Sequence, residues 1–328
     1  MKRVLSQVVL GTVLLLLVSA GWAAAREVIS FLPRKDGERF IHFIDIHGKL
    51  LPELIVDLGR IATFSWGPDG RWITYNSNKD GDPDIYAGNV KTDVEHRLTF
   101  HGSRDIWPSW SPNGKWIAFI SERGGEMDIY RMDTDGRNVK RLTNQGLCKR
   151  PAWSPDSKSI AFVSKSSLYV MTADGRGVRR LAETSSIDCS WAPDGKQIAF
   201  VPQGDAVGGI AVFSIDVNGR NMRQLTRLYK GLTLISDPVW SPSGKWIAYI
   251  LTEIPERLLE GARVPVNEVF ANSVICVANT ATSGGGKPLE ATRELVPGHL
   301  DWVPGGFLSV SPGAEKQMTL WGSLKQMK

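Results

Sequence analysis

The chain has 328 residues, of which 39 are Lys or Arg and 34 are Asp or Glu, so its net charge at pH 7 is +5. A charge this small and dispersed does not form the basic patch that nucleic acids or anionic membranes require. The three cysteines, Cys148, Cys189 and Cys276, have unrelated spacings that match no metal-binding motif. We expect them to be buried free thiols, with a Cys148–Cys189 disulfide as the alternative.

Residues 1–25 have the three parts of a secretory signal peptide. Lys2 and Arg3 precede an apolar run at 8–18, and alanines at 23–25 form a small-residue cleavage site. The run is shorter than the roughly 20 residues that span a membrane. We therefore expect an exported protein, periplasmic or extracellular, with no stable membrane insertion after cleavage. Without Lys2 and Arg3 its net charge is +3.

The segment after the signal peptide predicts three strands, at 27–31, 40–45 and 53–57, with a turn at 45–48. These would form one four-stranded blade that lacks its first strand.

From residue 66 onward one motif recurs: Trp, a small residue, Pro, usually Asp or Asn, usually Gly, then Lys or Arg and an apolar run. Pro favours the second position of a turn and Gly the left-handed position, so each copy predicts a hairpin. A period of about 40–50 residues indicates stacked modules that bury one another's faces. The anchor tryptophans are Trp66, Trp110, Trp153, Trp191, Trp240 and, in a weaker copy, Trp302.

In the repeat anchored on Trp110, strands are expected at 108–110, 116–121, 128–133 and 139–143, with an Asp-Gly turn at 135–136. Five complete blades follow from the five full copies. A sixth combines the N-terminal strands with a strand at 300–302, which removes a free sheet edge. The sequence thus predicts an all-β, six-bladed propeller of four-stranded antiparallel blades over residues 26–303, closed by both chain termini.

The combination Trp-Ser-Pro-Asp-Gly-Lys-x-Ile-Ala-Phe, Asp-Ile-Tyr-x-Met-Asp, Asp-Gly and Arg-Leu-Thr is similar to the repeat of TolB-like β-propellers, over about residues 27–303. The resemblance implies the fold more than the function. TolB proper carries an α/β domain before its propeller and works with a peptidoglycan-associated lipoprotein. Here the first blade consumes the residues before Trp66, so we expect neither that domain nor that role.

Two segments depart from the repeat. The last full copy has extra length at 251–270, with helical turns expected at 256–262. This insertion would be either a surface segment that fills a gap or a lip over the axial channel. The tail at 304–328 would either dock back on the propeller or engage another protein.

Binding usually resides on variable loops held by a rigid scaffold. The innermost strands enter from the end that carries such loops, and the positions three residues before each anchor are Thr63, Trp107, Arg150, Asp188, Asp237 and His299. Asp105 and Asp301 lie nearby in sequence. We expect these residues to ring the channel mouth and either bind a polar ligand or peptide terminus, or hold loop backbone. No metal motif supports a cation there, and the histidines at 42, 47, 96 and 101 are expected on the surface.

No nucleophile elbow, phosphate-binding loop or nucleotide fingerprint occurs, so we assign no catalytic residue and no cofactor. The favoured function is a non-enzymatic, monomeric scaffold that binds a protein or peptide, and no nucleic acid, through the variable loops. One alternative, suggested by the resemblance, is an extracellular carbohydrate lyase or hydrolase using His299 and Asp237. Another is a structural module of an envelope assembly.

Overall fold

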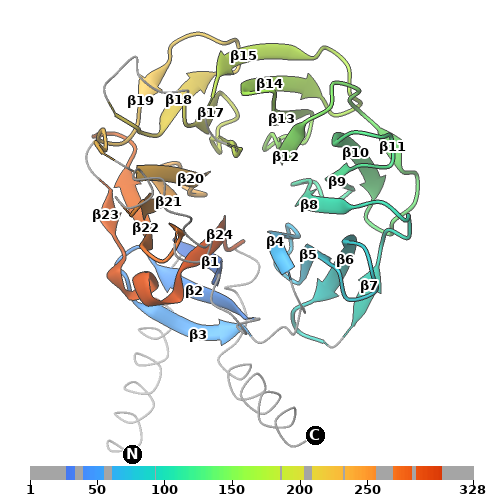
Figure 1. Ribbon diagram of the computed structural model, residues 1–328, viewed down its shortest axis with the longest axis horizontal. Helices are drawn as coiled ribbons and strands as arrows, with labels where there is room; N and C mark the ends of the chain where they lie inside the picture. Colours follow the sequence, from blue (N-terminus) through green and yellow to red (C-terminus); the bar gives the residue numbers. More distant parts are fainter. Residues whose placement is uncertain are drawn as a thin grey trace, which may run out of the picture.

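The computed structural model describes residues 27–33, 40–54, 61–92, 94–184, 187–202, 209–231, 233–255, 269–282 and 286–304. The expected signal peptide, the helical turns at 256–262 and the tail beyond Pro304 lie outside these ranges. Six four-stranded antiparallel sheets surround one axis (Figure 1). The prediction of an all-β, six-bladed propeller is confirmed.

Blade 1 combines strands from both ends of the described chain, because β24 pairs antiparallel with β1. Its strands, from the axis outward, are β24 (Pro297–Trp302), β1 (Val28–Pro33), β2 (Ile41–Asp45) and β3 (Leu50–Leu54). The short 3-10 helix η2 (Glu290–Leu295) precedes β24.

The other blades follow in chain order, each from its innermost to its outermost strand. Blade 2 contains β4 (Ile61–Trp66), β5 (Trp72–Ser77), β6 (Asp84–Asn89) and β7 (Glu95–Arg97). Blade 3 contains β8 (Asp105–Trp110), β9 (Trp116–Ser121), β10 (Asp128–Asp133) and β11 (Lys140–Arg141). Blade 4 contains β12 (Cys148–Trp153), β13 (Ser159–Ser164), β14 (Ser167–Thr172) and β15 (Arg179–Glu183). Blade 5 contains β16 (Ser190–Trp191), β17 (Gln197–Phe200), β18 (Phe213–Asp216) and β19 (Arg223–Gln224). Blade 6 contains β20 (Thr233–Trp240), β21 (Trp246–Glu253), β22 (Ser273–Asn279) and β23 (Lys287–Pro288).

Each tryptophan repeat closes its first hairpin with local hydrogen bonds. In blade 3, Asn113 Oδ1 accepts from the Lys115 N–H at 3.0 Å and Ser111 Oγ accepts from the Trp116 N–H at 2.9 Å. Gly114 follows with a φ of 72°, which a glycine adopts without strain. The strands expected at 116–121 and 128–133 coincide with β9 and β10.

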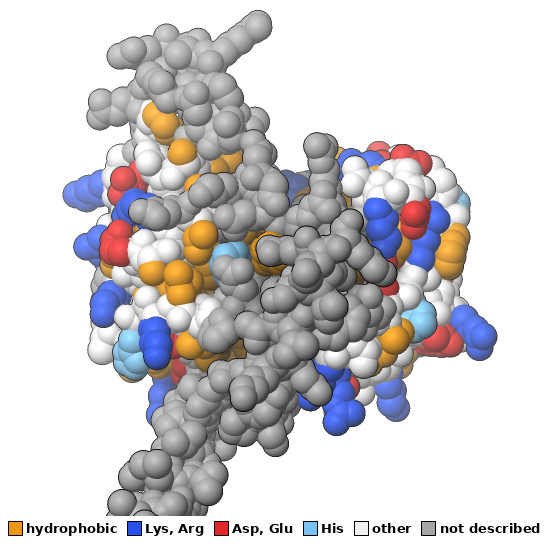
Figure 2. Space-filling view, turned by 90° about the horizontal axis from the view of Figure 1, so that it is seen from below, with side chains coloured by type: hydrophobic (Ala, Val, Ile, Leu, Met, Phe, Trp, Pro, Cys, Tyr) orange, Lys and Arg blue, Asp and Glu red, His pale blue; other side chains and the backbone are white. Residues whose placement is uncertain are grey.

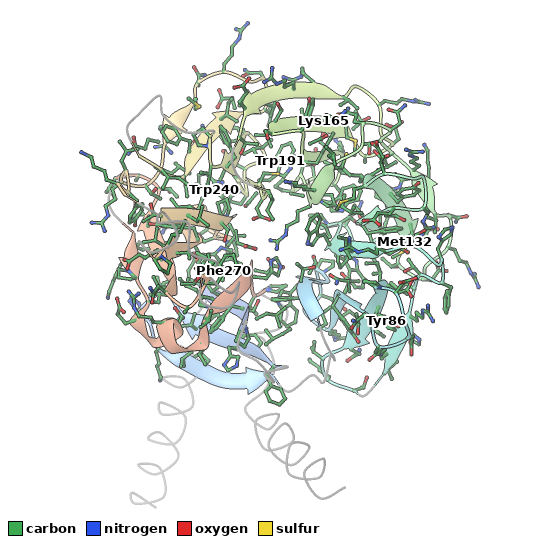
Figure 3. The ribbon with its side chains drawn as sticks, viewed as in Figure 1. Tyr86, Met132, Lys165, Trp191, Trp240 and Phe270 are labelled. Atoms are coloured by element: carbon green, nitrogen blue, oxygen red, sulfur yellow. The ribbon has the colours of Figure 1, made fainter. Side chains whose placement is uncertain are left out.

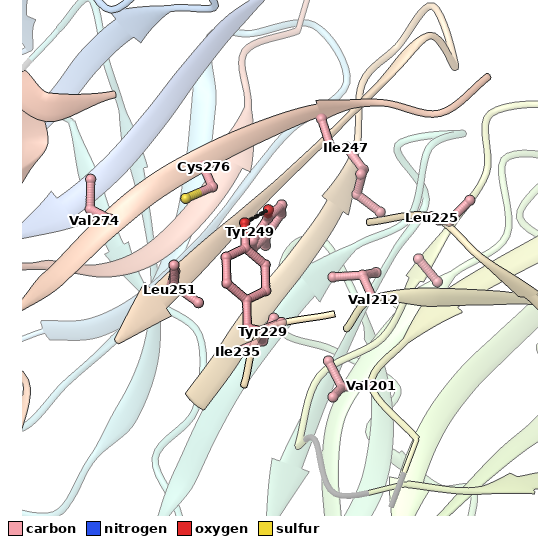
Figure 4. Close-up of a cluster of buried hydrophobic side chains, with 12 residues drawn as sticks. Val201, Val212, Leu225, Tyr229, Ile235, Ile247, Tyr249, Leu251, Val274 and Cys276 are labelled. Carbon is pink, nitrogen blue, oxygen red and sulfur yellow. Dashed lines mark hydrogen bonds between the residues drawn. The ribbon is translucent and has the colours of Figure 1, made fainter. Parts of the chain in front are cut away.

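The second strand of a blade is buried on both faces, so the hydrophobic cores lie between neighbouring blades. Figure 4 shows the cluster shared by blades 5 and 6, where the Tyr229 and Tyr249 hydroxyl oxygens lie 2.6 Å apart. Full burial of one large apolar side chain contributes roughly 1.5–3 kcal/mol. All three cysteines are buried and free, so the expected thiols are confirmed.

A polar triad near the outer rim accounts for the Asp-Ile-Tyr and Arg-Leu-Thr parts of the repeat. In blade 3, Arg141 Nη2 lies 2.5 Å from Asp128 Oδ2, and Thr143 Oγ1 donates to Asp128 Oδ1 at 2.7 Å. The same hydroxyl accepts from the Ile129 N–H at 2.9 Å, so the triad joins the third and fourth strands. We call this set and its blade 2 equivalent the rim triads; the equivalent consists of Asp84, Arg97 and Thr99.

The anchor tryptophans join adjacent blades. Three indole Nε1–H groups donate to a backbone carbonyl of the preceding blade's innermost strand: Trp153 to Ser109, Trp191 to Ala152 and Trp302 to Val239, at 3.0–3.1 Å. These tryptophans also end the innermost strands and begin the tight turns. We call this end of the propeller the turn face. The opposite end, with the linkers between blades, is the loop face.

The surface departs from expectation at one histidine. His42 lies in β2, which is buried on both faces, and its ring stacks on Phe31 with centroids 5.5 Å apart. Elsewhere, charges of both signs are interspersed on the uncovered part of Figure 2, and neither forms a continuous patch there. Among the described residues, no helix has the length and apolar character needed to cross a membrane.

Candidate functional site

The structure brings together four of the six positions expected around the channel. Arg150 lies in β12, Asp237 in β20, His299 in β24 and Asp188 just before β16. They come from four different blades, and their side chains are in contact. We call these four residues the axial cluster.

Arg150 forms the centre of the axial cluster. Its Nη1 lies 2.5 Å from Asp237 Oδ1 and 2.7 Å from Asp188 Oδ1. The same nitrogen lies 3.2 Å from His299 Nδ1. Blades 4 and 1 are three positions apart in the ring, so the Arg150 side chain crosses the axis to reach His299. Arg150 thus links blades on opposite sides of the ring.

Both ring nitrogens of His299 face acceptors. Nδ1 lies 2.6 Å from Asp237 Oδ1, and Nε2 lies 2.9 Å from the Phe64 carbonyl oxygen. Both contacts are made within the protein, so neither nitrogen faces a substrate in this arrangement.

The electrostatics of the two aspartates diverge. Burial raises the pKa of Asp188, which Arg150 only partly offsets. Burial would also raise the pKa of Asp237, but Arg150 and His299 together lower it below its ordinary value. Asp237 is therefore the stronger anion of the pair, because both Arg150 and His299 hydrogen-bond to its carboxylate.

Local backbone irregularities position these side chains. In blades 3, 4 and 6 the pairing of the first and second strands shifts register at the position three residues before the anchor tryptophan. Such bulges re-aim side chains. Trp107 and Asp237 have φ values of 53° and 49°, which are unusual for residues other than glycine. In all three blades the next residue is a proline, which has no backbone N–H to donate to the neighbouring strand: Pro108, Pro151 and Pro238.

The remaining predicted residues make scaffold contacts. The Trp107 ring lies 5.9 Å from the Arg150 guanidinium carbon, and Thr63 Oγ1 donates to Asn76 Oδ1 at 2.8 Å. Asp105 pairs with Arg123 of its own blade at 2.7 Å.

Asp301 joins blades 1 and 2 through backbone groups. Its Oδ1 accepts from the Trp302 N–H at 2.9 Å and its Oδ2 from the Trp66 N–H at 3.4 Å. Burial raises the pKa of this carboxyl to about 6, although His299 and both N–H groups oppose the rise. Asp301 therefore holds backbone groups at the ends of two innermost strands.

Sequence reasoning missed two features of the site. The Phe64 carbonyl that orients His299 has no side-chain signature, so no motif could reveal it. The Arg150 Nε is buried and makes no hydrogen bond to any described residue. The Arg150 and His299 side chains are 16% and 13% exposed, so solvent reaches the cluster. No three His, Cys, Asp or Glu residues converge as a metal site in the described ranges.

A protein-family model described as "TolB beta propeller domain" matches residues 18–145, 65–167 and 144–260. Among solved structures, TolB from Acinetobacter baumannii is 22% identical with a TM-score of 0.57, covering 85% of this chain and 67% of that one. A putative TolB from Agrobacterium tumefaciens is 18% identical with a TM-score of 0.60, covering 80% and 87%.

Oligogalacturonate lyase from Vibrio parahaemolyticus is 13% identical with a TM-score of 0.51, covering 80% of this chain and 71% of that one. Because 1083 solved chains match and these identities are low, the likeness concerns the fold alone. No curated protein sequence matches the chain significantly.

Proposed function

Because the chain belongs to the TolB β-propeller family, we propose that it is an exported, non-enzymatic scaffold that binds a protein or peptide through its loop face and channel mouth. The observation that carries the proposal is a pair of exposed apolar side chains, Phe100 and Leu147, on that face.

Phe100 and Leu147 occupy equivalent linkers. Phe100 lies between β7 and β8 and is 73% exposed; Leu147 immediately precedes β12 and is 55% exposed. Leu147 also has a φ of 52°, a conformation that costs a branched apolar residue energy. Neither burial nor backbone preference accounts for a leucine there. Exposed apolar side chains on adjacent linkers are a common feature of protein-binding surfaces.

The axial cluster supports this proposal through rigidity. Its ion pairs connect innermost strands on opposite sides of the ring, so the linkers project from a preformed frame. Complexes of such preformed surfaces usually form with little backbone movement. A partner would thus lose little entropy in ordering this protein's side of the interface.

A lyase or hydrolase is the second candidate, supported by the short His299–Asp237 contact of 2.6 Å and by the fold likeness to an oligogalacturonate lyase. A general base needs a nitrogen that can accept a proton from substrate. His299 Nε2 instead faces the Phe64 carbonyl, which argues against that role. Turnover of oligouronides by the purified protein, abolished by His299→Gln, would favour the enzyme instead.

The third candidate, a structural module of an envelope assembly, relied on the tail at 304–328, which lies outside the described residues beyond Pro304. Loss of assembly on deleting residues 313–328, with the propeller still folded, would favour it.

Light scattering tests the expected monomer, and N-terminal sequencing of the exported protein tests cleavage before Arg26.

Affinity capture with loop-face variants tests the main proposal. Phe100→Ser/Leu147→Ser should fold normally and lose the partner recovered by the unmodified protein. Met222→Ser is the matched control, because Met222 is 56% exposed but belongs to the turn between third and fourth strands, on the turn face. Equal recovery by all three proteins would overturn the loop-face assignment.

A further inference from the structure

A second surface emerges from one position of the repeat, the first residue of the second strand. In three of the five full tryptophan repeats this residue is itself tryptophan, whereas in blades 4 and 5 it is a smaller polar residue. In blade order it is Trp72, Trp116, Ser159, Gln197 and Trp246.

In blade 3 this tryptophan fills the turn face between two blades. Trp116 of blade 3 stacks on Trp153, the anchor of blade 4, with centroids 6.0 Å apart and an interplanar angle of 18°. The Arg131 guanidinium carbon lies 4.6 Å from the Trp116 ring centroid, and its Nη1 donates to the Ala173 carbonyl at 2.8 Å. The interface thus contains an indole, a second indole and a guanidinium.

Between blades 4 and 5 the first indole is missing. Strand pairing places Ser159 where blade 3 has Trp116 and Val170 where it has Arg131. The guanidinium at this interface belongs to Arg179 of the fourth strand, which pairs with Val170 and donates to the Val217 carbonyl. Of the two indoles only the anchor, Trp191, remains; it lies between these blades in Figure 3. A groove of about 620 Å³ opens there, and Ser159, Val170 and Trp191 contribute to its lining. We call it the Trp191 groove.

Two carboxylates lie at the rim of the Trp191 groove. Asp156 and Asp194, from the tight turns of blades 4 and 5, contribute to the lining. Each carboxylate accepts one backbone N–H within its own turn, and the Asp156 side chain remains 59% exposed. Arg179 also lines the groove, where its Nη2 donates to the Val217 carbonyl, and Lys158 Nζ lies 4.0 Å from Asp156 Oδ2. The groove therefore has charges of both signs, and the Asp156 and Asp194 carboxylates remain exposed to a ligand.

We infer that the Trp191 groove binds an aromatic side chain of a partner polypeptide, with an adjacent Arg or Lys facing Asp156 and Asp194. The aromatic ring of the occupant would take between blades 4 and 5 the place that Trp116 has between blades 3 and 4. Offset stacking on the indole provides the main contact, and the carboxylates select a basic neighbour. This site lies on the turn face and is independent of the loop-face function.

An acetylated and amidated Gly-Trp-Arg-Gly peptide carrying 5-fluorotryptophan provides a direct probe, observed by ¹⁹F NMR with the full-length protein. The unmodified protein should shift and broaden the fluorine resonance. Replacing Arg by Glu in the peptide should weaken binding about three- to tenfold, because the two rim carboxylates then repel it. Absence of any binding by the unmodified protein would overturn the proposal.

Ser159→Trp restores the missing indole and should weaken binding at least about tenfold while leaving the protein as stable as before. The matched control is Gln197→Trp, which changes the same position in blade 5 and should leave binding unchanged. Equal binding by Ser159→Trp and the unmodified protein would contradict the groove assignment.

Two further variants keep the test decisive. If Ser159→Trp folds poorly, Asp156→Asn/Asp194→Asn retains the turn acceptors, as Asn113 does in blade 3, and should weaken binding three- to tenfold. Deleting residues 313–328 should leave affinity unchanged. An increase on deletion would mean that the chain's own tail occupies the groove, and would overturn assignment to a partner.

Discussion

The protein contains two kinds of Asp–Arg pair. One kind recurs within single blades, and the other occurs once among the described residues and joins several blades. In the rim triads the aspartate is buried but the arginine reaches solvent; Arg141 is 39% exposed and joins strands of one blade. In the axial cluster Arg150 is 16% exposed and contacts three other blades. A rim triad stabilises the pairing of two strands within one blade. The axial cluster forms only when the four blades that contribute to it are in place.

The comparison predicts unequal costs for removing the arginine. Arg150→Ala should lower the free energy of unfolding by about 3–5 kcal/mol, because it removes the guanidinium that the buried Asp188 and Asp237 carboxylates share. Arg141→Ala should cost about 1 kcal/mol, because water replaces part of its contact. Urea unfolding of both variants measures the difference. Equal costs would mean that the axial pairs are no more consequential than those at the rim.

Asp237→Asn should cost about 2–3 kcal/mol at pH 7, since Asn tolerates the positive φ but removes the anion shared by Arg150 and His299. The pKa of Asp237 is lowered in the folded state, so its stabilisation is present above about pH 4 and is lost at lower pH. The deficit of the variant should therefore shrink in acid. A deficit that stayed constant from pH 7 to pH 3 would contradict the role of charge.

Asp301→Asn should show the opposite pH dependence. The folded pKa of about 6 exceeds the unfolded value near 4, so the carboxyl's contribution to stability falls as pH rises between these values. Asn does not titrate, and it should gain about 2–3 kcal/mol relative to Asp between pH 4 and pH 7. Thermal unfolding of both proteins at several pH values checks the trend. Parallel curves would show that this carboxyl titrates normally.

The smallest expected effect comes from backbone strain in a single hairpin turn. Lys165 and Ser166 form the two-residue turn between β13 and β14 with φ values of 46° and 57°. Such a turn favours Asn-Gly. Lys165→Asn/Ser166→Gly should therefore raise the free energy of unfolding by about 0.5–1 kcal/mol, measured by urea unfolding. A loss of stability would show that the original side chains make compensating contacts.

Sequence reasoning reached most of the fold because the repeat encodes it locally. The turn residues, the apolar second strands and the Asp-Gly hairpins each determine structure within about 45 residues, and β9 and β10 begin and end as expected. Counting three residues back from each anchor gave six positions, and those in blades 1, 4, 5 and 6 form the axial cluster.

The contacts within the site could not be predicted in the same way. Which residues meet across the axis depends on bulges in separate blades, and the register shift near Arg150 becomes evident only from strand pairing. The burial of His42 was missed because β2 is covered on both faces. The Ser159 substitution was visible in the repeat, but its meaning required the stacking of Trp116 on Trp153.

The pairing of β24 with β1 also has a consequence for biosynthesis. Ser30 and Asp301, bonded across these strands, are separated by 271 residues, so β1 leaves the ribosome long before its neighbour exists. During that interval its hydrogen-bonding edge is available to any other extended chain. Translation products that terminate before residue 297 lack β24, so the edge of β1 would stay unpaired and premature truncation would promote aggregation.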